Sequence, residues 1–104
     1  MKSKYKNIIT KVGNIKFHSK KEAKRYQELL LLKKAGEIKE LELQYPFKVA
    51  IENKHICTYY ADFVYQDQDD NMTVEDVKGG IKTPVYKLKK RLVEAYWGIK
   101  ITEI

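Results

Sequence analysis

The sequence predicts a single α/β domain in which a short β-hairpin precedes a helix, three strands, a second helix and a last strand. Three observations support this order. A Ser-x-x-Glu capping box at Ser19 opens a helical segment that ends before Gly36. Segments rich in β-branched and aromatic residues follow it. Thr83 and Pro84 then provide an N-cap and a first-turn proline for a second helix, which is expected to end at Gly98.

The first two elements are a hairpin and a helix. Residues 13–14, Gly-Asn, suit a two-residue turn between strands at 9–12 and 15–17. The first helix is expected over residues 19–35, with an inward stripe at spacings of three and four. That stripe comprises Ala23, Tyr26, Leu29, Leu30 and Lys33, and Glu22 begins it.

Three strands are expected next. Residues 38–52 alternate between apolar and polar side chains, and Pro46 is expected to mark a bend or bulge in that strand. Residues 58–65 and 72–78 are rich in β-branched and aromatic residues, and the polar residues 66–71 lie between them. This pattern predicts a β-hairpin.

The pairing of this hairpin brings acidic side chains together. If the strands pair antiparallel about Asp69, then Asp62 falls opposite Asp76, because their numbers add to twice 69. Side chains alternate along a strand, so Asp76 and Lys78 share that face and Glu75 points to the other. Like charges opposite each other destabilise a sheet, and a divalent cation such as Mg²⁺ would relieve their repulsion. A solvated, charged hairpin face is the alternative interpretation.

The last two elements are a helix and a strand. The helix is expected over residues 84–96, and the alternating residues 99–104 are expected to form the final strand. The inward side chains of this helix are expected to be Tyr86, Leu88 or Lys89, Leu92, Val93 and Tyr96.

Composition favours a polyanionic partner. The chain of 104 residues carries 21 Lys and Arg against 14 Asp and Glu, a net charge of +7, which favours nucleic acid. The whole chain, 1–104, is expected to be one domain, with residues 1–7 as a flexible basic arm. A single cysteine, Cys57, excludes an internal disulfide, and the longest aliphatic run, 29–32, is too short for a membrane span. A cytoplasmic protein without a membrane partner is therefore expected.

Short stretches spread over nearly the full chain match a known pattern. They are FHSKKEA (17–23), GEI (36–38), LQYPF (43–47), ADF (61–63), EDVKG (75–79) and YKLKK (86–90). With an acid in the first helix, an Asp in the second core strand and Asp-x-Lys in the third, the chain resembles the PD-(D/E)XK nuclease superfamily. It is most similar to small phage and prophage nuclease-like proteins related to Holliday-junction resolvases. Ala61 stands where that motif has proline.

The resemblance implies a restriction-endonuclease-like αβββαβ core, with a central mixed sheet flanked by two helices, behind the N-terminal β-hairpin. It also implies a metal site for Mg²⁺ or Mn²⁺ whose ligands are Asp62, Asp76 and Glu22, with Lys78 near the attacking water. For Glu22, capping the helix is the alternative role. The further candidates are Gln44 and Glu75.

The activity that the resemblance implies is Mg²⁺-dependent endonucleolytic hydrolysis of DNA in phage DNA processing or recombination, in the cytoplasm of a bacterial host. The chain would act as a monomer or a homodimer. The alternative is a non-catalytic phage protein of this fold that binds nucleic acid or protein. DNA phosphates would be contacted by Lys20, Lys21, Lys24, Lys82, Lys87, Lys89, Lys90 and Arg91.

Overall fold

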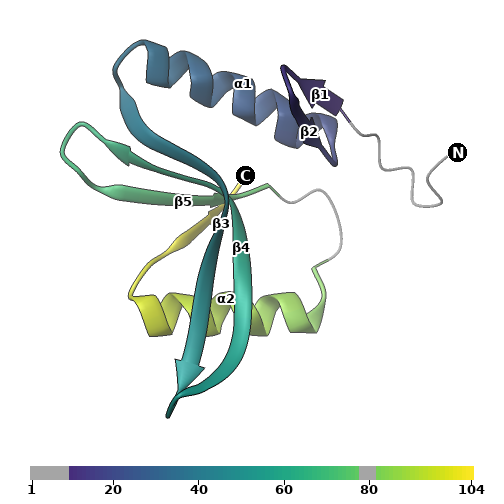
Figure 1. The fold of residues 1–104 in the computed structure, drawn as a ribbon, viewed down its shortest axis with the longest axis vertical. Helices are drawn as coiled ribbons and strands as arrows, with labels where there is room; N and C mark the ends of the chain where they lie inside the picture. Colours follow the sequence, from purple (N-terminus) through teal and green to yellow (C-terminus); the bar gives the residue numbers. More distant parts are fainter. Residues whose placement is uncertain (1–9, 78–81) are drawn as a thin grey trace, which may run out of the picture.

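The structure, a computed structural model that describes residues 10–77 and 82–104, confirms the predicted order of elements. A hairpin precedes a helix, three strands, a second helix and a last strand (Figure 1). The elements are β1 (Thr10–Val12), β2 (Ile15–Phe17), α1 (Lys20–Lys34), β3 (Ile38–Ile51), β4 (Lys54–Asp67), β5 (Met72–Asp76), α2 (Pro84–Trp97) and β6 (Ile101–Glu103). The expected basic arm at 1–7 and Lys78 lie outside the described residues.

The main sheet is mixed, with the strand order β3-β4-β5-β6. The first two pairings are antiparallel and β5 pairs with β6 in parallel. The small β1–β2 sheet and α1 lie on one side of this sheet and α2 lies on the other (Figure 1). The core beside α1 comprises Phe17, Ala23, Leu29, Ile38, Phe63 and Tyr65. The core beside α2 comprises Phe47, Val49, Tyr59, Ala61, Val64, Val74, Val93 and Ile101.

The long β3–β4 hairpin contributes to both cores. Every second residue of β4 from Tyr59 to Tyr65 is buried. The first two, Tyr59 and Ala61, pack beside α2, whereas the next two, Phe63 and Tyr65, pack beside α1. The strand therefore twists strongly between these two pairs, in the sense in which all sheets twist. Asp62 lies at the point where the hairpin passes from one helix to the other.

The turn of this hairpin was missed by the sequence analysis. We expected the second strand to begin at residue 58, but β4 begins at Lys54. Glu52 and Asn53 form the two-residue turn, with φ of 50° and 66°. Positive φ at both central residues is the geometry that matches the twist of a hairpin. Asparagine tolerates this conformation well, whereas glutamate gives no turn signal in the sequence.

Of the two predictions for Pro46, a bend or a bulge, the bulge was wrong. Pro46 pairs directly with Tyr60, and the two irregularities of the pairing lie between Lys39 and Glu42 and between Val49 and Ala50. Because β3 is the edge strand of the sheet, a residue without an N–H can stand in its middle without breaking a ladder.

Both helices begin and end where the capping signals predict. The Ser19 hydroxyl accepts a hydrogen bond from the Glu22 N–H at 3.1 Å, and Gly98 ends α2 with a φ of 65°. Their inward stripes are narrower than predicted. The side chains that were expected inside but are exposed are Leu30, Lys33 and Tyr96, and of the two alternatives Leu88 is exposed whereas Lys89 is half-buried. Within residues 10–77 and 82–104, the helices are too short and too polar to cross a membrane.

Candidate functional site

The register of the β4–β5 hairpin is the predicted one. Phe63 pairs with Glu75 and Val64 with Val74, so Asp62 and Asp76 occupy the next position along the two strands. Their carboxyl groups lie within hydrogen-bonding reach of each other. The structure therefore brings together the two carboxylates that the sequence placed on one face.

Asp62 is held on both of its oxygens. The side-chain amide of Gln44, on the neighbouring strand β3, donates to Oδ1 at 2.9 Å. The backbone N–H of Val77 donates to Oδ2 at 2.8 Å. Gln44, which the sequence offered only as a further candidate, thus contacts a predicted site residue directly.

Asp76 is only 2% exposed and is held by two tyrosines that the sequence analysis did not assign to the site. The hydroxyl of Tyr59 donates to Oδ2, and the hydroxyl of Tyr86 lies 3.0 Å from the same oxygen. The Tyr86 hydroxyl also lies 2.9 Å from Oε2 of Glu103, and its single hydrogen can serve one carboxylate at a time. Burial is the main cause that raises the pKa of both tyrosines, so both remain donors. Sequence periodicity indicated only that Tyr86 points inward.

Glu75 points away from this pair, as strand alternation predicts. Its side chain is 2% exposed and lies on the α1 side of the sheet. There Arg25 donates from Nε to Oε1 at 2.8 Å and from Nη2 to Oε2 at 2.6 Å, and the Tyr65 hydroxyl also donates to Oε2. The carboxylate of Glu75 is thus engaged in a buried ion pair with Arg25.

Glu22 lies half-buried in the first turn of α1, where its N–H completes the Ser19 cap. Its charge is among the influences that raise the pKa of Asp62, which places it in the electrostatic vicinity of the pair. Across residues 10–77 and 82–104, however, no three Asp, Glu, His or Cys side chains gather into one metal site. The described part of the chain offers two adjoining carboxylates with an acid nearby, and Lys78 lies outside it.

The predicted phosphate-binding residues differ in how accessible they are. Lys82 and Lys90 contact Oε1 of Glu103 at 2.8 and 3.5 Å, and Lys82 is the main cause that lowers the pKa of Glu103 to about 2. Lys89 is half-buried. The exposed members of the set are Lys20, Lys21, Lys24, Lys82, Lys87 and Arg91, and of these Lys82 is paired with Glu103.

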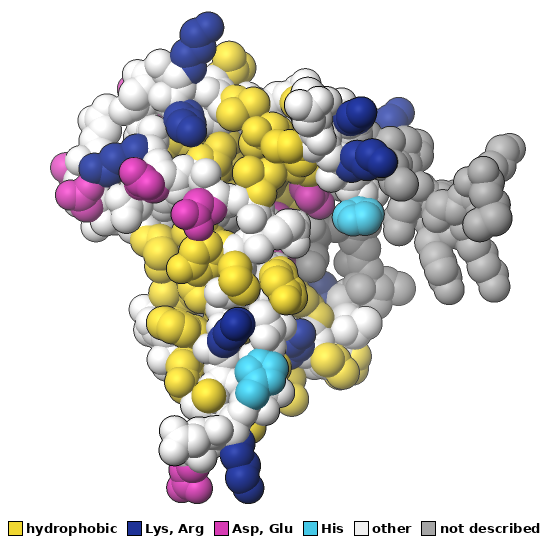
Figure 2. Space-filling model, viewed as in Figure 1, with side chains coloured by type: hydrophobic (Ala, Val, Ile, Leu, Met, Phe, Trp, Pro, Cys, Tyr) yellow, Lys and Arg dark blue, Asp and Glu magenta, His cyan; other side chains and the backbone are white. Residues whose placement is uncertain are grey.

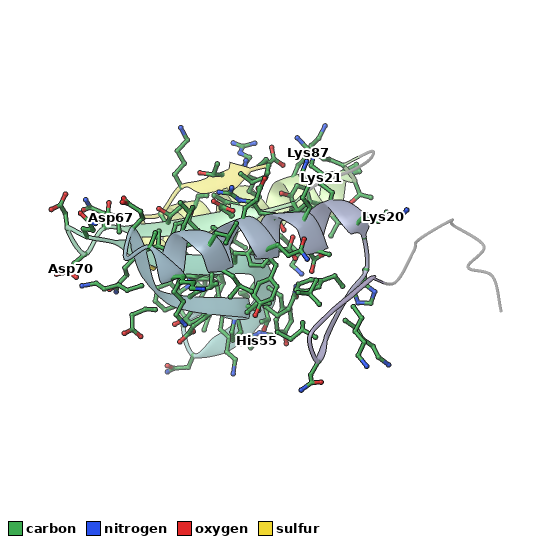
Figure 3. All side chains as sticks on the ribbon, turned by 90° about the horizontal axis from the view of Figure 1, so that it is seen from above. Lys20, Lys21, His55, Asp67, Asp70 and Lys87 are labelled. Atoms are coloured by element: carbon green, nitrogen blue, oxygen red, sulfur yellow. The ribbon has the colours of Figure 1, made fainter. Side chains whose placement is uncertain are left out.

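Charge is unevenly distributed over the molecule. Seen from above, Lys20, Lys21 and Lys87 extend from one end, where both helices begin, and Asp67 and Asp70 lie at the opposite end (Figure 3). A groove of about 270 Å³ runs along the start of α2 at the basic end. It is lined by Lys82, Tyr86, Lys87, Lys90, Arg91, Glu94 and Glu103. The end at which the helices begin therefore carries lysines from both helices.

Comparison with known proteins places the chain in a family. A family model described as "Protein of unknown function (DUF1064)" matches residues 2–104. The chain belongs to the DUF1064 family. No curated protein and no solved structure matches it.

The carboxylate pair gives this DUF1064 protein a pH-dependent stability. Burial, and next the hydrogen-bonded Asp76, raise the pKa of Asp62 from 3.8 to about 7, although the Val77 N–H acts in the opposite direction. At pH values between these two, the carboxyl group of Asp62 holds a proton in the folded state that it has released in the unfolded chain. Stability from this group is fully present below the unfolded pKa and is lost as pH rises through the folded pKa.

In EDTA, the melting temperature of the DUF1064 protein is therefore expected to fall as pH rises from about 5 to 8. After solvent screening of the half-buried Asp62, the loss corresponds to about 1–2 kcal/mol. Glu103 does not interfere, because its lowered pKa means that its contribution is lost only at acid pH. Calorimetry of the parent and of Asp62→Asn checks this result. A melting temperature that rises over this range, or an equal fall in Asp62→Asn, would contradict it.

Proposed function

We propose that the protein is a metal-dependent endonuclease that hydrolyses DNA phosphodiester bonds, built on a restriction-endonuclease-like core. The observation that carries this proposal is the meeting of Asp62 and Asp76 on adjacent strands of a mixed sheet. Two carboxyl groups within hydrogen-bonding reach are unfavourable when both are ionised, and a cation between them removes that cost. The exposed lysines at the start of α1 and α2 add the attraction for phosphate that a nuclease requires.

The donor atoms suit a hard cation. Mg²⁺ and Mn²⁺ prefer oxygen ligands, and Mg²⁺ is typically held by one or two carboxylates with water and phosphate oxygens completing its shell. Asp62 and Asp76 would hold the ion, and Glu22, whose charge helps to raise the pKa of Asp62, could add to them. When bound, the ion would polarise the scissile phosphate and lower the pKa of a coordinated water.

The protein's own contribution is to orient the two carboxylates. Gln44 and the Val77 N–H fix both oxygens of Asp62. Tyr59 and Tyr86 contact Oδ2 of Asp76, so the rotation of this carboxylate is restricted. Preorganised ligands of this kind need little rearrangement during the reaction. Lys78, in the role that the sequence resemblance implies, would stand near the attacking water.

The direct test is a cleavage screen with DNA junction, flap, duplex and single-stranded substrates, each with Mg²⁺, with Mn²⁺ and with EDTA. We expect cleavage of at least one substrate with either metal and none with EDTA. Binding without cleavage under every condition would favour the alternative function, a nuclease-like fold that binds nucleic acid or protein. The lack of a three-acid cluster among residues 10–77 and 82–104 is the observation that favours this alternative.

The two roles of Glu22 predict different outcomes for Glu22→Gln. Glutamine also serves at the third position of a capping box, so the cost to stability should be at most about 1 kcal/mol. If the charge of Glu22 supports the metal site, cleavage should fall by about 10²-fold or more while the melting temperature changes little.

Ser19→Ala is the matched control for this pair of roles. It removes the hydroxyl that accepts from the Glu22 N–H, which should cost about 1 kcal/mol of stability without a change in cleavage. Thermal melts and initial cleavage rates of both variants separate the roles. Near-parental cleavage by Glu22→Gln would leave Glu22 with its capping role alone.

A further inference from the structure

The β3–β4 hairpin has an outer face that the helices leave uncovered. Alternate residues point inward and are buried beside α2: Phe47 and Val49 on β3, Tyr59 and Ala61 on β4. The residues between them form the outer face, which comprises Gln44, Pro46 and Lys48 on β3 and Tyr60, Thr58 and His55 on β4. In Figure 1 α2 lies behind this hairpin, so Figure 2 shows the outer face from the front, with hydrophobic and basic side chains mixed over it.

The outer face is continuous with the carboxylate pair. Tyr60 is two residues from Asp62 on β4, a distance of about 6.5 Å along a strand, and it lies just before the point where the hairpin passes from α2 to α1. Pro46 lies directly opposite Tyr60, and Gln44, two residues before Pro46, donates to Asp62. A ligand that occupied the space in front of Tyr60 would therefore lie beside Gln44 and near Asp62, the half-buried member of the carboxylate pair.

The chemistry of the outer face combines an open aromatic ring with positive charge. Tyr60 is 59% exposed, in the part of β4 that pairs only with β3. Along residues 44–60 of the hairpin, Lys48 and Lys54 are exposed cations and Glu52, at the tip, is an exposed acid, whereas the exposed acids Glu40 and Glu42 lie nearer the start of β3. The His55 ring lies 2.9 Å from the Thr58 hydroxyl, which holds it on the same side as Tyr60.

We propose that the outer face binds single-stranded nucleic acid, with an unpaired base stacked on Tyr60 and a backbone phosphate near Lys48, and leads that strand to the carboxylate pair. This inference rests on the proposed nuclease function and names its substrate as a strand whose bases are unpaired beside the cut. Every base has a flat face that an aromatic ring can stack on, and the flanking lysines track the backbone. In a duplex the bases are already stacked on one another, so few base faces are open to stack on Tyr60.

Charge argues against a second copy of the chain as the occupant. A symmetric dimer that used this face would place the lysines of both copies in one interface, since a two-fold contact repeats the same residues on each side. Phosphates would neutralise the same lysines.

Binding is tested by fluorescence anisotropy in EDTA, with a labelled single strand of about 20 nucleotides, longer than the usual site size, and with the duplex of the same sequence. We expect Tyr60→Ala to bind the single strand about 5- to 150-fold more weakly and the duplex almost as the parent does. Tyr60→Phe keeps the ring and should keep the affinity. Tyr96→Ala removes a tyrosine that is 48% exposed on α2 and should change neither affinity.

Lys48→Gln provides an independent measurement on the same face. With one phosphate contact fewer, the plot of log affinity against log salt for the single strand should become shallower by about 0.7. Melting curves establish that each variant is folded. An unchanged affinity of Tyr60→Ala for the single strand, or an equal loss on both probes, would overturn the proposal. So would a parental dimer that Tyr60→Ala converts to a monomer in sedimentation.

The outcomes separate this inference from the nuclease proposal. Binding that depends on Tyr60, together with no cleavage under any condition, supports the outer face as a single-strand site and removes only the nuclease activity. Metal-dependent cleavage together with single-strand binding that does not depend on Tyr60 would contradict only the inference about the outer face.

Discussion

Asp76→Asn is expected to lower metal-dependent cleavage by about 10²- to 10³-fold or more while the metal-free protein stays at least as stable as the parent. The structure explains why the fold should tolerate this change. The amide oxygen of asparagine can take the place of Oδ2, which receives the hydroxyls of Tyr59 and Tyr86. Its amide nitrogen can then face Asp62 as a donor, and the repulsion between two carboxylates disappears.

The loss should be specific to metal binding. A cation that binds the folded state raises the melting temperature by mass action, so the parent should be stabilised by Mg²⁺ or Mn²⁺ and Asp76→Asn should not. Melting in EDTA and in each metal, together with cleavage rates, gives both readouts. Asp69→Asn makes the same chemical change in the exposed β4–β5 loop and should leave both unchanged.

The opposite pattern would place Asp76 among the residues that hold the fold together. If Asp76→Asn melts markedly lower than the parent in EDTA, the carboxylate makes structural contacts that asparagine cannot replace. If the variant keeps the metal-induced rise in melting temperature, the cation binds elsewhere. In both cases the site would have to be sought without Asp76.

Local signals in the sequence determined which strands pair and where the helices end. The β4–β5 register could be predicted because a short polar loop separates two β-rich segments, and its centre at Asp69 sets every pair. The meeting of Asp62 and Asp76 follows from that register alone. Likewise, the hydroxyl of Ser19 marks the start of α1, and the left-handed backbone conformation of Gly98 marks the end of α2.

Contacts between distant elements could not be predicted in the same way. Tyr59 and Tyr86 reach Asp76 from β4 and α2, and only the packed fold brings these elements together. Helical periodicity identified the inward face of α1, but the width of the surface that covers it decides how many residues are buried. Leu30 and Lys33 therefore lie exposed although they continue the pattern of Ala23 and Leu29.

The second large effect is expected at the buried ion pair on the other face of the sheet. Arg25→Met should lower stability by about 2–4 kcal/mol, because Glu75, which is almost fully buried, loses both guanidinium hydrogen bonds and its countercharge. The lower part of the usual range applies because the Arg25 side chain is 22% exposed and solvent screens part of the interaction. For a domain of this size, the melting temperature should fall by roughly 10–20 °C.

Glu75→Gln should be much milder than Arg25→Met. A glutamine can still accept the Tyr65 hydroxyl, and Arg25 keeps its contact with Glu28 at 3.2 Å and its access to solvent. Adding Glu75→Gln to Arg25→Met should restore most of the stability that Arg25→Met loses, because the uncompensated charge is then gone. Thermal melts of the two single variants and the double variant measure this coupling.

This cycle also decides between the two adjacent acids of β5. If Glu75 serves only the ion pair, Glu75→Gln should cleave DNA as the parent does, whereas Asp76→Asn should not. Equal destabilisation by Arg25→Met and Glu75→Gln, with no recovery in the double variant, would contradict the ion-pair account. A loss of cleavage in a stable Glu75→Gln would move the metal site toward the α1 face, where Arg25 and Tyr65 would then have to release Glu75 to a cation.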